Sequence, residues 1–524
     1  MSKRTVGITL LVATWVATTA FYWVGYVGTD DLFYARYAWL FHRPPINWWE
    51  FRIPAILAIR GSFHLLGPTE FAAALPSLVA SIAIAASVAW LVNWPRTMTW
   101  MSEASMLIAA LIPIDAGFRS LPSANQIAAG LLAVGTAAIL KGGTVAQMAG
   151  AALLAVAFLT HEVSFFYIAI FCLVALFFDP RRYWRPIACC VACSAVLFVA
   201  ECAVYRALVG DALARFKMAA GTTARFELGV DPDTGISGLR FFAWPLQNLV
   251  LGKSFGFDLL ALLTTGAIAW RRMTSEQRIL MTTVFGVYFW LGYGSQVPWA
   301  YKPLYRQAQY YNPISLGVAS LLPAAAVLAL HHQRRAQALV AAALAVHVLT
   351  LTATGGYGEN VNVSRALLAY AAGHPQQRFL TDLGTMNEMY TLNGFRLPAN
   401  VVCLDNNVVT NGLIVNKEPP GVPRYHFPRG AVDGVLINLE RPQVHAFEKI
   451  FTQFIGDHEG LRTTVAPMRY RPLFRPLMLV MRPRSFMILS RGGELLTTRS
   501  GSLREDAVLR PERQPLHPRL EAPQ

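Results

Sequence analysis

The chain has 524 residues, of which 54% are hydrophobic and only 14% are charged. A soluble domain typically has about 25% charged residues, so this composition excludes an ordinary soluble protein and indicates a membrane protein with several spans. The formal net charge of +15 is not arranged as a basic stripe among aromatic residues, which excludes nucleic acid as an expected partner. The chain has six cysteines, and they do not predict a disulfide framework. The sequence contains neither a CxxC…CxxC nor an HExxH motif, so no metal site is predicted.

Apolar runs long enough to cross a bilayer recur from residue 6 to residue 354. Spans are predicted near 6–26, 71–93, 101–118, 124–140, 144–160, 163–179, 186–205, 253–270, 278–296, 312–330 and 336–354. The basic clusters between them lie at Arg96, Lys141, Arg181–Arg185, Arg271–Arg272 and Arg334–Arg335. All of these clusters fall on the side of the N-terminus, so the positive-inside rule places the N-terminus in the cytoplasm and, after eleven crossings, the C-terminal part outside.

The predicted fold is therefore an α-helical polytopic membrane protein with about eleven transmembrane helices and a small C-terminal α/β domain. Residues 1–355 are expected to form the membrane domain, and its first outer loop, 28–70, is expected to contain juxtamembrane helices. From residue 356 to 497 the composition turns polar, and short strands are predicted near 378–382, 400–404, 434–438 and 477–481. The charged, proline-rich residues 498–524 are predicted to be disordered.

Two adjacent carboxylates, Asp30 and Asp31, follow the first span at the membrane–water boundary. One interpretation is structural: Thr29 or Asp30 caps a juxtamembrane helix whose dipole favours acids in its first turn. The other is chemical: an acid in this place can act as a general base and take a proton from an acceptor hydroxyl. Both interpretations can hold for the same residues.

The sequence Asp30-Asp31-Leu-Phe-Tyr34 resembles the opening motif of GT-C glycosyltransferases, in the branch of the protein O-mannosyltransferases and the lipid A aminoarabinose transferase. The stretches Trp48–Arg52, Phe63–Phe71 and Arg306–Pro313 resemble the same branch. The resemblance covers roughly residues 1–355. It implies an active site on the outer face, a polyprenyl-phosphate-linked sugar donor and an inverting mechanism. It also implies that Asp30 is the base and that cations hold the lipid phosphate.

The chain departs from this pattern in two places. The family often has a second acid at the start of the fourth span, but here the stretch Arg119–Gln126 has none. Asp115 is the candidate to supply that carboxylate, and the alternative is an acid that only reaches toward water. Where the family often has Thr-Lys after the fifth span, this chain has His161-Glu162, a pair that suits substrate binding, proton tuning, metal binding or simply a solvated hairpin.

Cations and tyrosines on the outer side complete the candidate site. Arg306, Lys302 and Arg52 are candidates for the donor phosphate, because Arg binds phosphate bidentately and Lys as a point charge. The alternative for Arg52 is an ion pair with a nearby acid. Tyr34, Tyr310 and Tyr311 are expected to bind substrate, the alternative being an aromatic belt at the membrane interface. Glu201, near the outer end of its span, faces either the cavity or the interface.

The expected function is transfer of a sugar from a polyprenyl-phosphate carrier to a hydroxyl of an envelope glycan, lipid or protein. The expected location is the bacterial inner membrane, with the C-terminal domain in the periplasm and membrane lipid around the spans. No cofactor is assigned, and the sequence leaves a divalent-cation requirement open. A transporter or flippase of lipid-linked sugars is an alternative that predicts pseudo-symmetric halves, and no internal repeat is found. A non-catalytic envelope assembly protein on the same fold is the other alternative.

Overall fold

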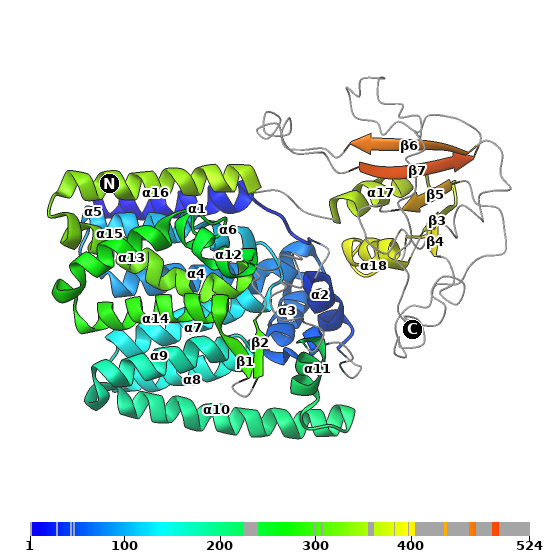
Figure 1. Ribbon diagram of the computed structural model, residues 1–524. Coiled ribbons are helices and arrows are strands. Elements are labelled where there is room, and N and C mark those ends of the chain that lie inside the picture. Colours follow the sequence, from blue (N-terminus) through cyan, green and yellow to red (C-terminus); the bar gives the residue numbers. More distant parts are fainter. Residues whose placement is uncertain are drawn as a thin grey trace. The chain divides into compact units, whose positions relative to one another are not determined.

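The structure is a computed structural model. It describes residues 3–27, 30–41, 45, 48–223, 239–297, 300–304, 308–354, 361–381, 383–396, 398–403, 434–437, 461–467 and 485–491. The chain folds as two compact units, the first before residue 360 and the second from residue 360 onward (Figure 1). Each unit is described by itself.

The first unit is a helical bundle with short additional elements between its helices (Figure 1). Its first half contains α1 (Lys3–Phe21), α2 (Asp30–Trp39), η1 (Trp48–Phe51), α3 (Ile53–Leu66), α4 (Glu70–Leu91), α5 (Trp100–Leu111), α6 (Pro113–Phe118), α7 (Ala124–Lys141), α8 (Thr144–Thr160) and α9 (Ser164–Phe178). Its second half contains α10 (Pro180–Val209), α11 (Ala214–Thr223), α12 (Leu239–Val250), α13 (Asp258–Ala269), η2 (Trp270–Arg272), α14 (Ser275–Tyr293), β1 (Ser295–Val297), β2 (Ala300–Pro303), η3 (Ala308–Ile314), α15 (Ser315–Leu330) and α16 (Gln333–Thr354).

Each predicted span overlaps a helix in the structure, although the spans near 6–26, 253–270 and 278–296 extend beyond their helices, and one span has an internal break. The predicted span 101–118 is divided into α5 and α6, because Pro113 lacks the N–H that a continuous helix needs. In the part of the chain that the structure describes, six helices are long and apolar enough to cross a membrane, and four shorter apolar helices accompany them. The protein is a multi-pass membrane protein, and the number of eleven crossings stays a prediction.

Polar side chains at the loop–helix junctions fix where several helices begin. Thr69 accepts the N–H of Ala72 at the start of α4, and Ser123 accepts the N–H of Gln126 at the start of α7. Such caps satisfy backbone N–H groups that have no partner inside the helix. The two caps therefore fix the starts of α4 and α7, two helices at the centre of the bundle.

Close helix packing holds the centre of the bundle together. At Gly130 of α7, a Cβ would lie 2.7 Å from the Cβ of Ala80 on α4. Gly135 of α7 and Gly150 of α8 approach in the same way, since a Cβ on either would lie within 2.8 Å of the other's carbonyl oxygen. Small residues at helix contacts are typical of membrane bundles, in which backbone proximity replaces the hydrophobic driving force.

The bundle has two ends that differ in their polar contacts. At the end that carries α2, here called the α2 end, Arg52 before α3 meets Glu162 of the α8–α9 turn. At the opposite end, here called the η2 end, Arg182 near the start of α10 pairs with Glu276 near the start of α14 at 2.6 Å. Figure 1 shows α2, α3, α11 and the β1–β2 hairpin gathered at the first of these ends.

The second unit is built on a mixed sheet with two helices. It contains α17 (Val361–Gly373), β3 (Phe379–Thr381), α18 (Leu383–Leu392), β4 (Val401–Cys403), β5 (Gly434–Ile437), β6 (Leu461–Pro467) and β7 (Ser485–Arg491). The strand order is β4-β3-β5-β7-β6, with β3 parallel to β4 and β5 and with antiparallel pairing across β5, β7 and β6. The predicted strand at 477–481 and the predicted disordered tail lie outside the described residues, and β6 and β7 were not predicted.

Candidate active site

Six side chains that the sequence singles out converge at the α2 end of the bundle. They are Asp30 and Tyr34 of α2, Arg52 before α3, His161 and Glu162 of the α8–α9 turn, and Tyr310 of η3. Their positions are up to 280 residues apart in the sequence, so the fold and not local spacing creates the group. This set, together with Arg215 of α11, is called the α2-end cluster below.

Asp30 is the first residue of α2 and differs sharply from its neighbour Asp31. The carboxylate of Asp31 is buried and accepts the backbone N–H of Val27 at 2.7 Å, which ties the start of α2 to the preceding loop. Burial raises the pKa of Asp30 to about 6, although the charge of Arg52 and the indole of Trp49 favour its ionised form. Asp30 therefore has a proton affinity suited to a base that works near neutral pH.

Arg52 is almost completely buried and contacts two of the other cluster residues. Its Nη2 lies 2.5 Å from Oε1 of Glu162, its Nε donates to Oε2 of the same carboxylate at 3.2 Å, and its Nη1 donates to the hydroxyl of Tyr34. Burial alone opposes the charge of the guanidinium, but Glu162 outweighs it and raises the pKa of Arg52. The side chain is thus a permanent cation beside Asp30.

Glu162 lies between two arginines. Besides the two bonds from Arg52, its Oε2 accepts from Nη2 of Arg215 at 3.3 Å. Nη1 of Arg215 donates in turn to Oε1 of Glu201 at 2.7 Å. Burial opposes the charge of Glu162, but the two arginines hold the pKa of its carboxyl well below the ordinary value. The result is a row of alternating charges: Arg52, Glu162, Arg215 and Glu201.

His161 is buried beside this row and is neutral. Burial and the charge of Arg52 lower the pKa of His161 to about 3. Its Nδ1 accepts the backbone N–H of Val163 at 3.2 Å, which leaves the proton of the neutral ring on Nε2. Within the described part of the chain, Nε2 has no hydrogen-bond partner, and it lies 3.9 Å from Oε1 of Glu162. The imidazole packs against the ring of Tyr310 with 5.5 Å between centroids.

The remaining predicted site residues take other places. Tyr311 is buried with its ring 5.4 Å from that of Tyr288 on α14. Lys302 belongs to β2, and its side chain lies outside the described part of the structure. Arg306 lies outside the described residues.

Asp115 does not join the α2-end cluster in the contacts that the structure describes. It is fully buried in α6, where its Oδ2 lies 3.0 Å from Nη2 of Arg119 and accepts from Ser81 at 2.6 Å. Its Oδ1 accepts from Nε2 of Gln126 at 2.6 Å. With three partners on two oxygens, this carboxylate holds α4, α6 and α7 together. The alternative of an acid that reaches toward water is wrong for Asp115, because none of its side chain is exposed.

The sequence analysis missed Arg215 and left the role of Glu201 open. Both are almost completely buried, although Arg215 lies in an outer segment that looks like an ordinary polar loop in the sequence. Two signals in the sequence point to them: Glu201 is an acid within an apolar helix, and Arg215 is a cation on the side that the positive-inside rule leaves poor in cations. Neither signal shows with which residue the side chain forms its ion pair.

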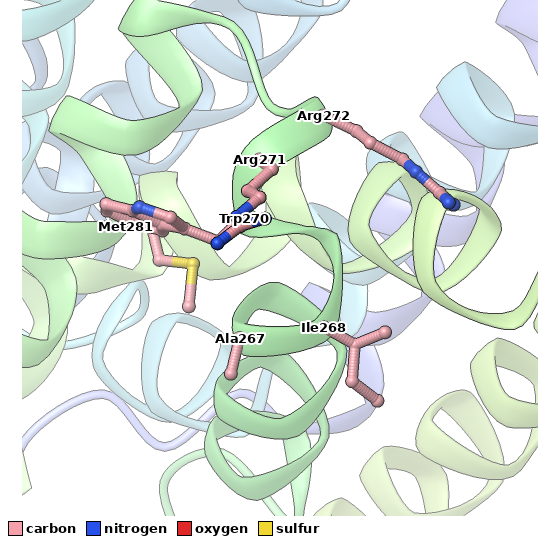
Figure 2. A pocket seen from close by; sticks show the side chains of 6 residues that line it. All are labelled: Ala267, Ile268, Trp270, Arg271, Arg272 and Met281. Carbon is pink, nitrogen blue, oxygen red and sulfur yellow. The ribbon is translucent and has the colours of Figure 1, made fainter.

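The structure also has a pocket away from this cluster. It lies at the η2 end and is lined by Ala267, Ile268, Trp270, Arg271, Arg272 and Met281 (Figure 2). These residues belong to α13, η2 and α14, and none of them is a member of the α2-end cluster. Among the residues that the structure describes, no group of three or more His, Cys, Asp or Glu side chains is placed to hold a metal ion.

Comparison with solved structures matches nearly the whole chain. ArnT from Cupriavidus metallidurans bound to undecaprenyl phosphate aligns with a TM-score of 0.53 and 11% identity, over 93% of this chain and 97% of that chain. The apo state of the same protein aligns with a TM-score of 0.52 and 13% identity, with the same coverage. The chain therefore shares its fold with these two structures.

The expected resemblance to GT-C glycosyltransferases is thereby confirmed at the level of the fold. An oligosaccharyltransferase from Archaeoglobus fulgidus also matches, with a TM-score of 0.44 and 11% identity over 75% of this chain and 63% of that chain. No family model matches the sequence, and no curated protein matches it. The likeness of fold to ArnT is therefore visible in the structure at a level of identity that sequence comparison does not reach.

Proposed function

We propose that this protein is a glycosyltransferase that moves a sugar from a polyprenyl-phosphate carrier to a hydroxyl group of an envelope glycan, lipid or protein. The observation that carries the proposal is the carboxylate of Asp30, which is buried next to Arg52 at one end of a bundle with the GT-C fold. An acid with a pKa of about 6 is ionised at neutral pH and still binds a proton well enough to act as a base.

The proposed step is a single displacement with inversion. Asp30 removes the proton of the acceptor hydroxyl while the oxygen of that hydroxyl forms a bond to the anomeric carbon of the sugar. The bond between that carbon and the phosphate oxygen breaks, and the polyprenyl phosphate leaves with the electron pair. The proton ends on Asp30, and the leaving group is a stable phosphate monoester, so no nucleotide or redox partner is needed.

The donor class follows from the fold and the cations. One matching structure, ArnT from Cupriavidus metallidurans, is described as bound to undecaprenyl phosphate. In this chain Arg52, together with Lys302 and Arg306, is proposed to bind the donor phosphate, since guanidinium groups match its geometry. Tyr34 and Tyr310 are proposed to line the sugar or lipid, and His161 is proposed to bind the donor.

The proposed placement in the cell is the bacterial inner membrane. The N-terminus is placed in the cytoplasm, and the membrane domain 1–355 has its active site on the periplasmic face. Residues 356–497 are proposed to form a periplasmic α/β domain that shapes access for the acceptor.

The test replaces Asp30 by Asn in a strain that otherwise lacks the chain. Mass spectrometry of its envelope glycans, lipids and proteins should show a sugar that wild type restores and Asp30→Asn does not. The purified variant should still bind undecaprenyl phosphate, because asparagine keeps the size of the side chain and removes only the base. Asp211→Asn is the matched control, since this exposed carboxylate pairs with Lys217 outside the cluster and its loss should leave transfer intact. Full transfer by Asp30→Asn would overturn the mechanism.

A further inference from the structure

Glu162 sits in a pair of guanidinium groups as an oxyanion ligand would. Arg52 approaches it along two parallel N–H···O contacts of 2.5 and 3.2 Å, and Arg215 approaches Oε2 from another side at 3.3 Å. A guanidinium presents the same paired donors to phosphate as to carboxylate. The two arginines thus form an anion site that, in this structure, contains the protein's own carboxylate.

The carboxylate fills this anion site incompletely. Nε2 of His161 carries a proton, is buried and has no partner among the described residues, yet it stops 3.9 Å from Oε1 of Glu162. A buried donor without an acceptor is costly, so a larger oxyanion bound at this place would satisfy a donor that Glu162 leaves unused. A phosphate group is larger than a carboxylate and has more acceptor oxygens, which lets it reach both guanidinium groups and this third donor.

Glu162 is also the member of the row that is able to leave. Its side chain is 26% exposed, whereas those of Arg52 and Arg215 are 1% and 4% exposed. It belongs to the short turn between α8 and α9, so rotation of its side chain requires no helix movement.

Both arginines keep other partners when Glu162 turns away. Arg215 retains Glu201 at 2.7 Å and the carbonyl oxygens of Phe158 and Leu159, and Arg52 retains the hydroxyl of Tyr34. Arg215 then keeps the counter-charge of Glu201, whereas Arg52 keeps only a neutral hydroxyl and receives its counter-charge from the incoming phosphate. Glu162 is therefore expected to leave only as the phosphate arrives, because a buried cation without a counter-charge is expensive.

We infer that Glu162 is a displaceable stand-in for the donor phosphate: it occupies the anion site of Arg52, Arg215 and His161 in the empty enzyme and gives way when the lipid-linked phosphate binds. This inference rests on the proposed function. In this role the carboxylate of Glu162 competes with the donor phosphate for the arginines. It keeps the arginines charged and ordered, and it lowers the apparent affinity of the protein for the donor. An equilibrium of this kind reduces affinity by the fraction of molecules whose site is open.

The test measures binding of undecaprenyl phosphate to the purified full-length protein in detergent. Glu162→Gln should bind it about tenfold more tightly than wild type, because the neutral amide no longer competes for the arginines. A purely structural role for Glu162 predicts the opposite sign, since Arg52 would lose the group that positions it. Glu276→Gln, which breaks an ordinary glutamate–arginine pair at the η2 end, is the matched control and should leave the affinity unchanged.

Further arms separate the possible outcomes. Undecaprenol lacks the phosphate, so its binding affinity should be the same for Glu162→Gln and wild type. Inorganic phosphate should compete with undecaprenyl phosphate more strongly in this variant than in wild type. Glu162→Asp, which keeps the charge on a shorter side chain, should gain less than Glu162→Gln and guards against a folding defect of the latter. If a folded Glu162→Gln binds undecaprenyl phosphate as wild type does or more weakly, the inference is overturned and the proposed function stands. If wild type does not bind undecaprenyl phosphate, both the inference and the proposed function are overturned.

Discussion

Neighbouring buried side chains of the α2-end cluster differ in their charge states. Arg52 is sealed from solvent and stays charged because Glu162 binds it on two edges. His161 is equally sealed, and burial together with the charge of Arg52 keeps its imidazole neutral. Asp30 lies between these limits, since burial favours its protonated form and Arg52 favours its ionised form. Burial and the charge of Arg52 together therefore set the protonation states of these neighbours.

The raised pKa of Asp30 predicts the pH dependence of transfer. Above about pH 6 the carboxylate is ionised and accepts a proton, whereas below that pH it is increasingly protonated and inactive as a base. We expect kcat/KM to fall about tenfold per pH unit on the acid side of an inflection near pH 6. The measurement is initial transfer rate against pH at fixed ionic strength. An inflection near 4, the ordinary value for an aspartate, would show that burial does not act on the base.

The buried pair of Asp115 and Arg119 predicts a stability effect that is separate from catalysis. Asp115→Asn leaves the guanidinium of Arg119 buried without its counter-charge, which costs about 3–5 kcal/mol of unfolding free energy. The double variant Asp115→Leu with Arg119→Met should be markedly less destabilised, because it removes both charges. Thermal melting of the detergent-purified protein measures both. If Asp115→Asn melts like wild type and yet transfers no sugar, Asp115 takes part in the chemistry after all.

The sequence indicates much of the site because its residue types are unusual for their places. Asp30, Arg52 and the His161-Glu162 pair each stand out as polar groups at the boundary of apolar runs. Their partners do not follow from the sequence: nothing in it shows that Arg52 binds Glu162, which is 110 residues away. Arg215 escapes for the same reason, since a basic residue in a polar loop is ordinary until the fold buries it.

At the scale of elements, α7 is the helix whose packing decides the centre of the bundle. It contacts α4 through Gly130 and α8 through Gly135, and in both places the neighbouring backbone occupies the space of a side chain. These contacts explain why the predicted spans at 71–93, 124–140 and 144–160 form a compact group. Hydropathy predicts the helices, but it does not predict which of them touch.

Gly130→Ala should destabilise the protein although alanine is the better helix former. The new Cβ would lie 2.7–2.9 Å from Cβ, Cα and O of Ala80, so α4 and α7 must move apart, at a cost of about 1–3 kcal/mol. Gly61→Ala is the control, since a Cβ at this helical position of α3 meets nothing within 4 Å and should be neutral or slightly stabilising. Melting temperatures of the two variants test the contrast. Equal values would mean that the helices are not packed as closely as described.

At this scale, the sequence does not predict one helix break and two strands. Helix positions follow from apolar runs, but the break between α5 and α6 depends on one proline that many membrane helices tolerate. In the second unit, β6 and β7 were not predicted, because neither sequence alternates apolar and polar residues: β6 has three consecutive polar residues, 462–464, and β7 has an apolar run of only four residues, 486–489. Their antiparallel pairing, from Leu461 with Arg491 to Pro467 with Ser485, is set by partners across the sheet.

For the first unit as a whole, the two ends of the bundle balance charge differently. At the α2 end, two buried arginines are matched by Glu162 and Glu201, with Asp30 beside them. The η2 end is dominated by cations: Arg182, Arg271, Arg272, Arg278, Arg334 and Arg335. An excess of cations at one end agrees with the orientation proposed above, in which the η2 end faces the cytoplasm.

The short loop between α1 and α2 gives the bundle one more property. Its backbone is pinned at three points: the N–H of Val24 donates to Ser120, that of Tyr26 to Glu70, and that of Val27 to Asp31. Two of these anchors belong to the α4 and α6 regions, not to α1. A span adapts to a thinner or thicker bilayer by tilting. When α1 does so, the anchors hold the start of α2 against the rest of the bundle. We therefore expect the position of Asp30 relative to the rest of the bundle to be insensitive to the tilt of the first span.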